Sequence, residues 1–440
     1  MNILFSLFYR IPNKFLPRIL NFFLLIFRLP KSNSKAKSVL FVNTHDQSGG
    51  ASKICYSLFK NEFSRGAKLV VGFKKNENQS VYEINNKNSF YIKTLNFLSD
   101  FAKKGDWLDF DKIGFLKIKN QIQISNFNII HLHNLHGGYF SYALLPKLKK
   151  FTRVIWTLHD EHILTGHCAF TMKCDGWIRD CGNCPDLNVY PAIKTDNAES
   201  LLFWKKKWIN QLDPYIIVPS KWLGDRVRKS FPKLSNIHLI YNGIDTDVFY
   251  PMNKKNLRDE LNLPSDKFLV LYIAEFSTNN PFKGGETVRK VIESNRNDNI
   301  CFITIGSKND SFSINHIELS YISDEKNLAR LYSACDVLFY PTTADNLPLV
   351  VLEAMACGLP VVSSNIGGID EIIDDEVDGF LIKYNVDYKD FMVLIDKLYN
   401  LRKSEFFEQL CINARNKIIS KFTLNKMIES YRKVYDSFSN

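Results

Sequence analysis

The chain has 440 residues and a mass of 51.0 kDa, which is too large for one ordinary hydrophobic core and predicts two or three domains. Hydrophobic residues make up 45% and charged residues 23% of the sequence, values that exclude a disordered, collagen-like or multi-span membrane protein. The formal net charge of +11 admits nucleic acid, anionic lipid or phosphorylated small molecules as partners.

Most of this charge lies in residues 1–37, which carry +7 and contain no acidic residue. Within them, residues 17–29 alternate basic and apolar side chains with helical spacing, which predicts an amphipathic helix lying in the plane of a membrane surface. A helix packed on the protein's own core and a cleavable signal or anchor are the alternatives. The remainder of the chain carries only +4, which argues against a nucleic-acid-binding protein.

Beyond residue 37, short β-branched runs alternate with helical segments, which predicts parallel sheets covered by helices. We expect one doubly wound domain over residues 38–218, with strands at 38–43, 68–73, 128–131, 154–158 and 215–218. A second is expected over residues 219–420, with strands at 268–274, 300–305, 317–322, 337–340 and 360–363. Its predicted helices are 286–293, 325–333, 348–357, 369–373, 387–401 and 404–421. The last helix, at about 424–438, is expected to pack back on the first domain as part of a segment 421–440.

Ligands of such domains bind beyond the carboxyl ends of the strands, so polar residues there are the candidates. Gly49 and Gly50 follow the first strand and precede a helix, where free N–H groups favour phosphate. Seven of the nine histidines precede residue 170, and His159, directly after the strand 154–158, is the candidate for catalysis. The spacing His159-x-x-His162 also admits metal ligation.

A cysteine-rich loop at residues 163–190 holds Cys168, Cys174, Cys181 and Cys184. Four thiolates with a closely spaced final pair suit a structural tetrahedral Zn²⁺ site with all four as ligands. Two disulfides in an exported protein, or reduced cysteines that pack the loop, are the alternatives.

In the second domain, Lys283-Gly284 lies before a predicted helix and offers a point charge and backbone N–H groups to a diphosphate. Asp345 begins the stretch Asp345-Asn346-Leu347 in a loop after a strand, and Glu353 follows eight residues later in the next helix. Carboxylates accept hydrogen bonds from sugar hydroxyls. Gly367-Gly368 forms a second loop that admits a close approach.

The stretch Asn242–Pro251, the Lys283-Gly284 pair and the Asp345-x7-Glu353 block together resemble the family-4 retaining glycosyltransferases. Trp156–Asp160 and the cysteine loop resemble the colanic-acid and exopolysaccharide branch of that family. The resemblance implies an α/β fold of the GT-B type, with two doubly wound Rossmann-like domains facing a central cleft. It also implies a nucleotide-diphosphate sugar donor, a UDP- or GDP-sugar, and no catalytic metal.

By the same resemblance, Lys283 binds the donor diphosphate, Glu353 the ribose hydroxyls and Asp345 the transferred sugar. His159 lies beside that sugar and Gly50 near the phosphates. Two departures from the family pattern stand out. Glu275-Phe276 occupies a region where a basic residue is common, and Asp345 replaces a more usual Glu.

We therefore expect a retaining glycosyltransferase that moves a sugar to a saccharide acceptor on a polyprenyl diphosphate lipid, in cell-surface polysaccharide assembly. It is expected in the cytoplasm, held on the inner face of the cell membrane through residues 1–37. A GT-B sugar-nucleotide epimerase, a catalytically silent scaffold and a non-catalytic zinc-containing binding protein are the alternatives.

Overall fold

The computed structural model describes residues 38–75, 77–84, 126–149, 152–275, 277–306, 315–384 and 386–438. The amphipathic segment expected within residues 1–37 lies outside these ranges. Among the helices that the structure describes, none combines the length and apolar character that crossing a membrane requires.

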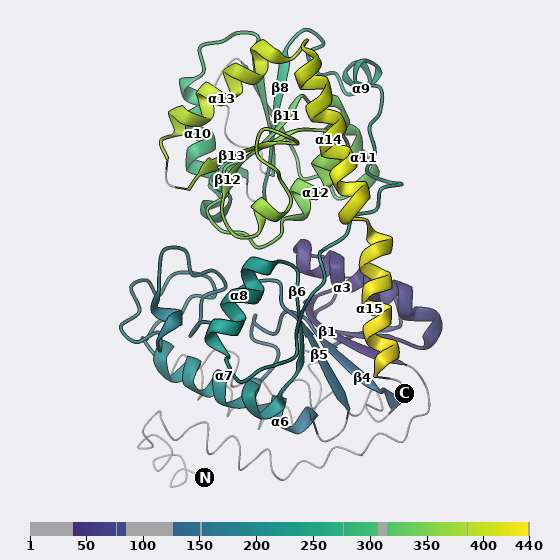
Figure 1. Cartoon of the computed structure of the whole chain (residues 1–440), viewed down its shortest axis with the longest axis vertical. Coiled ribbons are helices and arrows are strands. Elements are labelled where there is room, and N and C mark those ends of the chain that lie inside the picture. The colour runs from purple at the N-terminus through teal and green to yellow at the C-terminus, as the bar shows by residue number, and fades with distance from the viewer. Residues whose placement is uncertain are drawn as a thin grey trace. The chain divides into compact units, whose positions relative to one another are not determined.

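The chain divides into two compact units, and each is built on its own parallel sheet (Figure 1). Unit 1 contains the described residues up to Pro219, together with Leu223–Ile240 and Tyr431–Asn440. Unit 2 contains Ser220–Trp222 and Tyr241–Ser430. The domain boundary expected at residue 218 differs from this division, because the chain after Pro219 adds a further helix and strand to the first unit.

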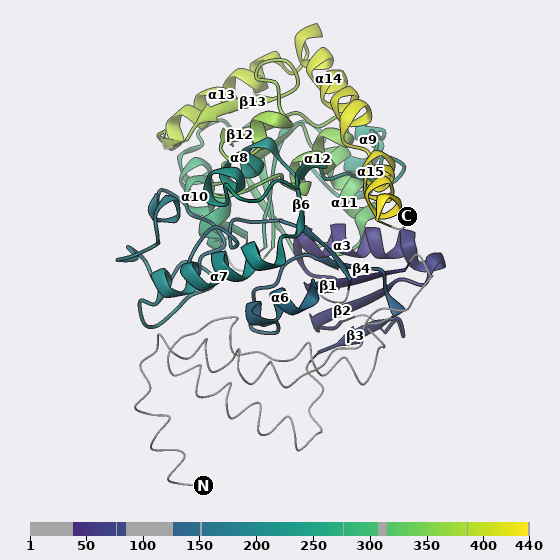
Figure 2. The ribbon, with the colours of Figure 1, turned by 60° about the horizontal axis from the view of Figure 1, so that its bottom comes forward.

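Unit 1 holds a seven-stranded sheet in the order β3-β2-β1-β4-β5-β6-β7, and the strands β1 to β4 lie side by side in Figure 2. Its strands are β1 (Val39–His45), β2 (Lys68–Phe73), β3 (Val81–Glu83), β4 (Ile129–Leu132), β5 (Arg153–Thr157), β6 (Tyr215–Val218) and β7 (Ile237–Leu239). Its helices are α3 (Gly49–Glu62), α6 (Leu145–Leu148), α7 (Ala198–Leu212) and α8 (Lys221–Ser230), and the last helix α15 (Leu424–Ser437) joins it from Tyr431 onward.

Unit 2 holds a six-stranded sheet in the order β10-β9-β8-β11-β12-β13. Its strands are β8 (Phe268–Ile273), β9 (Ile300–Ile305), β10 (His316–Leu319), β11 (Val337–Tyr340), β12 (Val361–Asn365) and β13 (Phe380–Lys383). Its helices are α9 (Lys254–Glu260), α10 (Gly285–Ser294), α11 (Glu325–Ala334), α12 (Leu349–Ala356), α13 (Tyr388–Leu401) and α14 (Glu405–Lys421). Figure 1 shows α10 and α13 on one side of this sheet and α9 and α11 on the other.

The central strands form because their sequences are continuous apolar runs that a sheet covered on both faces can bury. Every residue of β9 and β11 is buried, as are the first six residues of β1. The face of the second sheet toward α10 and α13 packs Val270, Phe339 and Val362 against Val291 and Ile395 in one core cluster. The two sheets and their covering helices agree with the predicted fold class.

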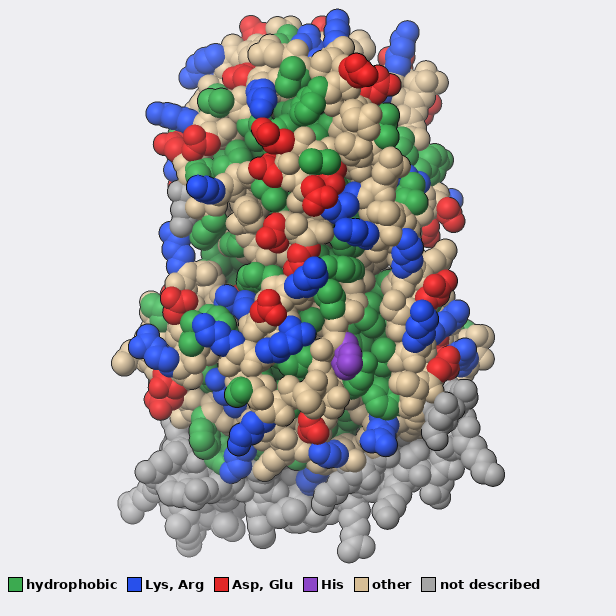
Figure 3. All heavy atoms as spheres, in the orientation of Figure 1, with side chains coloured by type: hydrophobic (Ala, Val, Ile, Leu, Met, Phe, Trp, Pro, Cys, Tyr) green, Lys and Arg blue, Asp and Glu red, His purple; other side chains and the backbone are tan. Residues whose placement is uncertain are grey.

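Several short elements depart from the sequence expectations. The strands β3, β7 and β13 and the helices α6 to α9 were not predicted, and the helix expected at 369–373 is a 3₁₀ turn, Ile369–Glu371. On the face seen in Figure 3, basic and acidic side chains lie among one another over most of the described surface. This pattern fits the near-neutral balance of residues 38–440.

Candidate functional site

The strand order of unit 2 reverses between β8 and β11, which is where ligands bind in doubly wound sheets. From β8 the chain moves outward to β9 and β10, whereas β11 leads the other way to β12 and β13. The loop after β8 contains the 3₁₀ turn Pro281–Lys283, and the loop after β11 contains Asp345. Two of the residues singled out in the sequence therefore follow the two strands of the switch point.

Lys283 and Asp345 form an ion pair at this position, with 2.5 Å between Nζ and Oδ2. The phenol of Tyr340, at the end of β11, donates to the same carboxylate oxygen at 2.5 Å. The side chain of Lys283 remains 24% exposed and that of Asp345 13% exposed. The pair is thus a partly accessible cation and anion held together by side chains of the second unit alone.

Glu353 lies in α12 and is almost fully buried, with 2% of its surface exposed. Its Oε2 accepts a hydrogen bond of 2.9 Å from the phenol of Tyr332 in α11. Burial, followed by the neighbouring Glu353 carboxylate, raises the pKa of Tyr332 well above its ordinary value, so this phenol stays protonated and keeps donating. The structure thus fixes one oxygen of Glu353 to its own scaffold.

In unit 2, Gly284 and Gly367 must be glycine, because the backbone of a neighbouring loop occupies the space of a side chain. A Cβ on Gly284, whose φ is +72°, would lie 1.8 Å from the carbonyl oxygen of Pro341. A Cβ on Gly367, whose φ is +67°, would lie 1.9 Å from the carbonyl oxygen of Asp345. The close approach expected at these glycines is therefore present, but the approaching group is the protein's own backbone.

Asn346 and Leu347 are also used by the scaffold. The side chain of Asn346 is buried and its Oδ1 accepts from the hydroxyl of Ser220 at 2.5 Å, while its carbonyl accepts from the N–H of Gly368 at 2.8 Å. Leu347 is buried, and its carbonyl accepts from the Asn242 amide at 3.1 Å. These bonds hold the backbone around Asp345 in place.

In unit 1 the predicted glycines stand at an open helix start. Gly49, with φ of +79°, begins the 14-residue helix α3, and a Cβ added there would meet nothing within 4 Å. Gly49 and Gly50 are both exposed, and the side chain of Ser48 makes no capping hydrogen bond to the first turn. The first N–H groups of α3 are therefore accessible to an anion.

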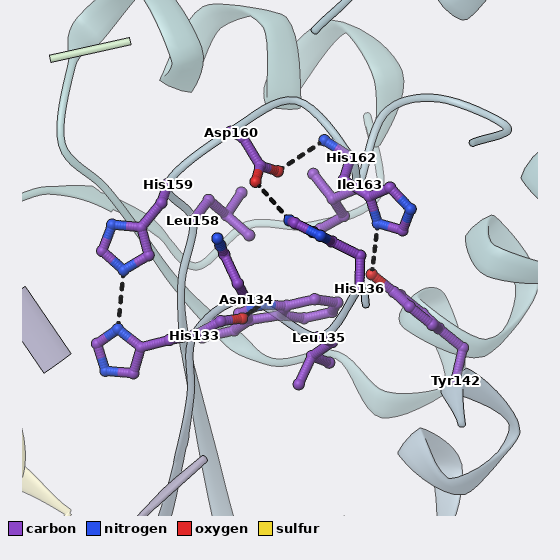
Figure 4. Close-up of a pocket in the computed structure, with 11 residues that line it drawn as sticks. His133, Asn134, Leu135, His136, Tyr142, Leu158, His159, Asp160, His162 and Ile163 are labelled. Carbon is purple, nitrogen blue, oxygen red and sulfur yellow. Dashed lines mark hydrogen bonds and ion pairs between the residues drawn. The ribbon is translucent and has the colours of Figure 1, made fainter. Parts of the chain in front are cut away.

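His159 forms a hydrogen bond to a second histidine that the sequence did not assign to the site. Its Nε2 lies 2.8 Å from Nδ1 of His133, which follows β4, and the two rings stack at an interplanar angle of 14° (Figure 4). Burial lowers the pKa of His159 to about 4, against the opposing effect of Asp160, and burial lowers the pKa of His133 well below its ordinary value. Both imidazoles are neutral near pH 7.

The hydrogen bond between two neutral imidazoles restricts where their protons lie. Nε2 of His133 is buried and has no hydrogen-bond partner among the described residues. Orphaned buried N–H groups are rarer in proteins than under-satisfied acceptors, which favours leaving Nε2 bare and placing the proton on Nδ1. His133 then donates to Nε2 of His159, and His159 carries its own proton on Nδ1, where it is a hydrogen-bond donor.

A histidine–carboxylate pair lies beside His133 and His159 in unit 1. Nε2 of His136 lies 2.7 Å from Oδ2 of Asp160, whose other oxygen accepts from the backbone N–H of His162 at 3.0 Å. Burial acts to raise the pKa of Asp160, but His136 and the N–H of His162 outweigh it and lower that pKa. His133, His136, His159 and Asp160 all line one pocket of about 210 Å³ (Figure 4).

The cysteines of the loop between β5 and α7 are free thiols. Cys168, Cys174, Cys181 and Cys184 are all partly exposed. Within the described ranges, no three His, Cys, Asp or Glu side chains stand where they could already hold a metal ion. The zinc site with these four ligands stays a prediction.

The sequence did not identify three residues that hydrogen-bond to the candidate site residues: Tyr332, Tyr340 and His133. Tyr340 belongs to the apolar strand β11, and Tyr332 lies on the buried face of the amphipathic helix α11, so both are typical core residues and no polar pattern singles them out. The sequence position of His133 could have indicated its role. His133 follows β4 and His159 follows the adjacent strand β5. In a parallel sheet the ends of adjacent strands meet, so these two histidines could have been paired.

Comparisons with known proteins identify the class of enzyme to which this chain is similar. Residues 101–248 match the glycosyltransferase family 4 model, and residues 253–417 match the model of glycosyl transferases group 1. A putative colanic acid biosynthesis glycosyl transferase, WcaC of Escherichia coli, is 24% identical over 363 residues, covering 76% of this chain and 85% of the relative. A UDP-Gal:alpha-D-GlcNAc-diphosphoundecaprenol alpha-1,3-galactosyltransferase of Escherichia coli is 28% identical over 214 residues, covering 45% of this chain and 54% of that relative.

Among solved structures, the sucrose-phosphate synthase of Thermosynechococcus elongatus aligns with a TM-score of 0.67 and 19% identity, over 91% of this chain and 98% of that one. HepE of Anabaena in complex with UDP-glucose aligns with a TM-score of 0.64 and 15% identity, over 91% and 99% of the two chains. These likenesses establish the fold. With glycosyltransferase models matching both halves, the chain belongs to the family-4 glycosyltransferases and has the two Rossmann-like domains of the GT-B fold.

Proposed function

We propose that this glycosyltransferase moves a sugar, with retention of anomeric configuration, from a UDP-sugar to a saccharide carried on a polyprenyl diphosphate lipid. The observation that carries the proposal is the Lys283–Asp345 ion pair at the strand-order switch of unit 2. A partly exposed cation beside a carboxylate supplies the two groups that a sugar diphosphate needs, one for phosphate and one for hydroxyls.

Donor binding would separate the ion pair and use each partner. The ammonium of Lys283 would move to the diphosphate, whose negative charge grows as the glycosidic bond breaks. Asp345 would then accept hydrogen bonds from the transferred sugar. Glu353, which has one oxygen fixed by Tyr332, would receive the ribose hydroxyls on its carboxylate.

The choice of UDP is supported by the relatives. HepE was solved with UDP-glucose, and the galactosyltransferase relative is named for UDP-Gal. The retaining outcome rests on the resemblance to family 4. In that mechanism the acceptor hydroxyl attacks from the face that the phosphate leaves, a phosphate oxygen takes its proton, and neither a side-chain nucleophile nor a catalytic metal is required.

Residues of unit 1 would assist at the sugar and the phosphates. His159, with its proton on Nδ1, is suited to donate to a sugar oxygen, and its low pKa keeps it neutral at working pH. The accessible N–H groups near Gly49 and Gly50 would add to the stabilisation of the diphosphate.

The acceptor class and the cellular location come from the relatives and the sequence. One relative is named for an acceptor on diphosphoundecaprenol and another for colanic acid biosynthesis, which supports a lipid-linked saccharide in cell-surface polysaccharide assembly. The basic segment 1–37 would hold the cytoplasmic enzyme on the inner face of the membrane where such lipids reside.

Calorimetry with UDP tests the donor site. We expect Lys283→Met to weaken UDP binding at least tenfold, which is about 1.4 kcal/mol, because the diphosphate loses its cation. Asp345→Asn should bind UDP as tightly as the wild type or more tightly, because Lys283 no longer has to leave an ion pair. The matched control is Lys290→Met, which removes an exposed lysine of α10 paired with Glu286. Equal UDP affinity for the wild type, Lys283→Met and Lys290→Met would contradict the assignment.

A further inference from the structure

The loop between β5 and α7 brings three of its cysteines close together. The backbone N–H of Cys181 donates to the carbonyl of Gly176 at 3.0 Å, and a Cβ on Gly176 would lie 3.2 Å from Sγ of Cys174. Cys174 and Cys184 both lie near enough to interact electrostatically with the thiol of Cys181. Residues distant in the loop sequence therefore place their sulfurs within electrostatic range of one another.

The backbone of this loop is arranged to favour sulfur anions. The N–H of Gly176 donates to Sγ of Cys174 at 3.3 Å, two residues along the chain. The backbone of Gly166, the residue before His167, hydrogen-bonds to the thiol of Cys181. Hydrogen bonds from N–H groups to ligand sulfurs are the outer-shell contacts that stabilise bound thiolates in metal sites.

One ring nitrogen of His167 points at one of the cysteine sulfurs. Its Nδ1 lies 2.8 Å from the carbonyl oxygen of Pro191, and because a carbonyl only accepts, Nδ1 carries the ring proton. In the neutral imidazole the other ring nitrogen, Nε2, is then unprotonated and can accept or ligate. That nitrogen lies 3.4 Å from Sγ of Cys184.

This spacing is that of two ligands of one ion. With Zn–S near 2.3 Å and Zn–N near 2.0–2.1 Å, two ligand atoms of a tetrahedral site are separated by roughly 3.6 Å. Metal-bound histidines also characteristically donate their other ring N–H to a carbonyl, as His167 does to Pro191. In the structure the Cys184 thiol lies within hydrogen-bonding distance of Nε2 and, at 3.5 Å, of the carbonyl oxygen of Asp186, and a divalent cation would replace the thiol proton.

A buried cation lies beside the same loop. Lys205 of α7 is 2% exposed, and its charge acts to lower the pKa values of the Cys168 and Cys181 thiols, although burial raises both. Three thiolates and one neutral imidazole around a divalent ion leave a net charge of −1, which this ammonium would offset.

We propose that Cys174, Cys181, Cys184 and His167 bind one zinc-class divalent ion. The three cysteines are partly exposed, and because the described side chains do not already surround an ion, binding would close the site by rotating them and releasing their thiol protons. His167 thereby replaces Cys168 in the predicted ligand set. The thiol of Cys168 instead hydrogen-bonds to the side chain of Thr165.

The test is metal analysis of the full chain, purified anaerobically from zinc-supplemented cells. We expect about one zinc per chain by mass spectrometry of the metal content. After replacement by Co²⁺, we expect the intense visible and near-ultraviolet bands of a tetrahedral thiolate site. Cys184→Ser and His167→Ala should each lower the zinc content at least fivefold, whereas Cys168→Ser and the unit 2 control Cys411→Ser should keep it.

Two results would overturn the proposal. Absence of zinc from the folded wild type, after incubation with excess Zn²⁺ under reducing conditions, would leave packed thiols or disulfides as the state of the loop. Retention of zinc in His167→Ala together with its loss in Cys168→Ser would return the ligand set to four cysteines. For any variant that folds poorly, the Co²⁺ spectrum of its soluble fraction decides between these outcomes.

Discussion

At the scale of single residues, the function proposed for His159 depends on His133. The bond of 2.8 Å between their ring nitrogens fixes the proton of His159 on Nδ1 only if His133 donates. A donor at this position is therefore a positioning group: it does not touch the sugar, but it decides whether His159 can donate to it.

Substitution of His133 separates this role from simple packing. In His133→Leu the proton of His159 is free to occupy Nε2, so we expect kcat to fall at least tenfold with little change in the KM for the donor. In His133→Asn the amide nitrogen lies as many bonds from Cα as Nδ1 does, so it can still donate to His159 and should restore much of the activity. Steady-state kinetics of the two variants measures the difference.

His238→Leu provides the control, because His238 of β7 stacks on Tyr215 of β6 and takes no part in the pocket. Equal losses of kcat in the Leu and Asn variants of His133 would contradict the proton assignment and leave His133 a packing residue.

At the scale of elements, the ends of β4 and β5 concentrate histidines that the folded state holds neutral. Burial is the first cause that lowers the pKa values of His131, His133, His159 and His162. His131 is held by Thr157 at 2.7 Å and by Tyr435 of α15 at 2.8 Å, so the last helix contributes to this histidine layer.

This layer predicts that the protein loses stability in mild acid. Unfolded histidines bind protons below about pH 6.5, whereas His159 does so only near pH 4 and the others well below 6.5. The unfolded state therefore binds more protons, so the free energy of unfolding stays constant above about pH 6.5 and falls as the pH decreases. Each such histidine contributes up to about 1.4 kcal/mol per pH unit.

Urea unfolding at pH 7.5, 6.5, 5.5 and 5.0 measures how the free energy of unfolding changes with pH. In His159→Asn about one proton fewer is taken up on unfolding, so this slope should be smaller. Asp160, whose pKa is lowered, stays charged over that range, whereas burial raises the pKa of Asp378 to about 6, so this carboxylate takes up a proton in the folded state and offsets part of the effect of the four histidines. A free energy of unfolding that is unchanged between pH 7.5 and 5.0 would show that these histidines can be protonated in the folded state.

The elements also show what the sequence could predict. The strands β2, β6, β9 and β11 were placed to the residue, because each has a largely apolar run that the covered sheet buries. The strands β3, β7 and β13 were missed, since each has three or four residues and gains its strand character from pairing with a neighbour.

The site divides in the same way. Lys283, Asp345 and His159 could be predicted because each is polar and follows a strand that the sequence marks clearly. The hydrogen bonds of Tyr332, Tyr340 and His133 could not, because they depend on which helix or strand end lies opposite. At Gly284 and Gly367 the group that approaches closely is protein backbone, and the approach of a ligand to the glycine loops stays a prediction.

At the scale of the whole molecule, both units contain a parallel sheet whose strand order reverses near its centre. In unit 1 the strand order reverses between β1 and β4, and Thr44 near the end of β1 holds the loop after β4, because its hydroxyl donates to the carbonyl of His136 at 2.9 Å. In unit 2 the reversal lies between β8 and β11, where Lys283 meets Asp345. Gly49 and Gly50 therefore follow β1 at the switch point of unit 1, and Lys283 and Asp345 lie at the switch point of unit 2, whereas His159 follows β5, one strand beyond the switch point of its sheet.

Most of the net charge of the chain comes from residues outside the candidate site. The basic segment 1–37 supplies most of the +11, and phosphate recognition in the described units is assigned to one lysine and two glycine loops. Membrane association and catalysis can therefore be tested separately, and catalysis is the central claim.

The most direct measurement of that claim incubates the purified full chain with a panel of UDP- and GDP-sugars, with and without a synthetic saccharide on a polyprenyl diphosphate. We predict that one UDP-sugar is consumed in step with acceptor glycosylation and that the new linkage keeps the donor's anomeric configuration. Glu353→Gln should lower kcat/KM at least tenfold, about 1.4 kcal/mol. Conversion of the donor to its epimer at an equal rate without acceptor, or no turnover of any donor by the folded protein, would contradict the account.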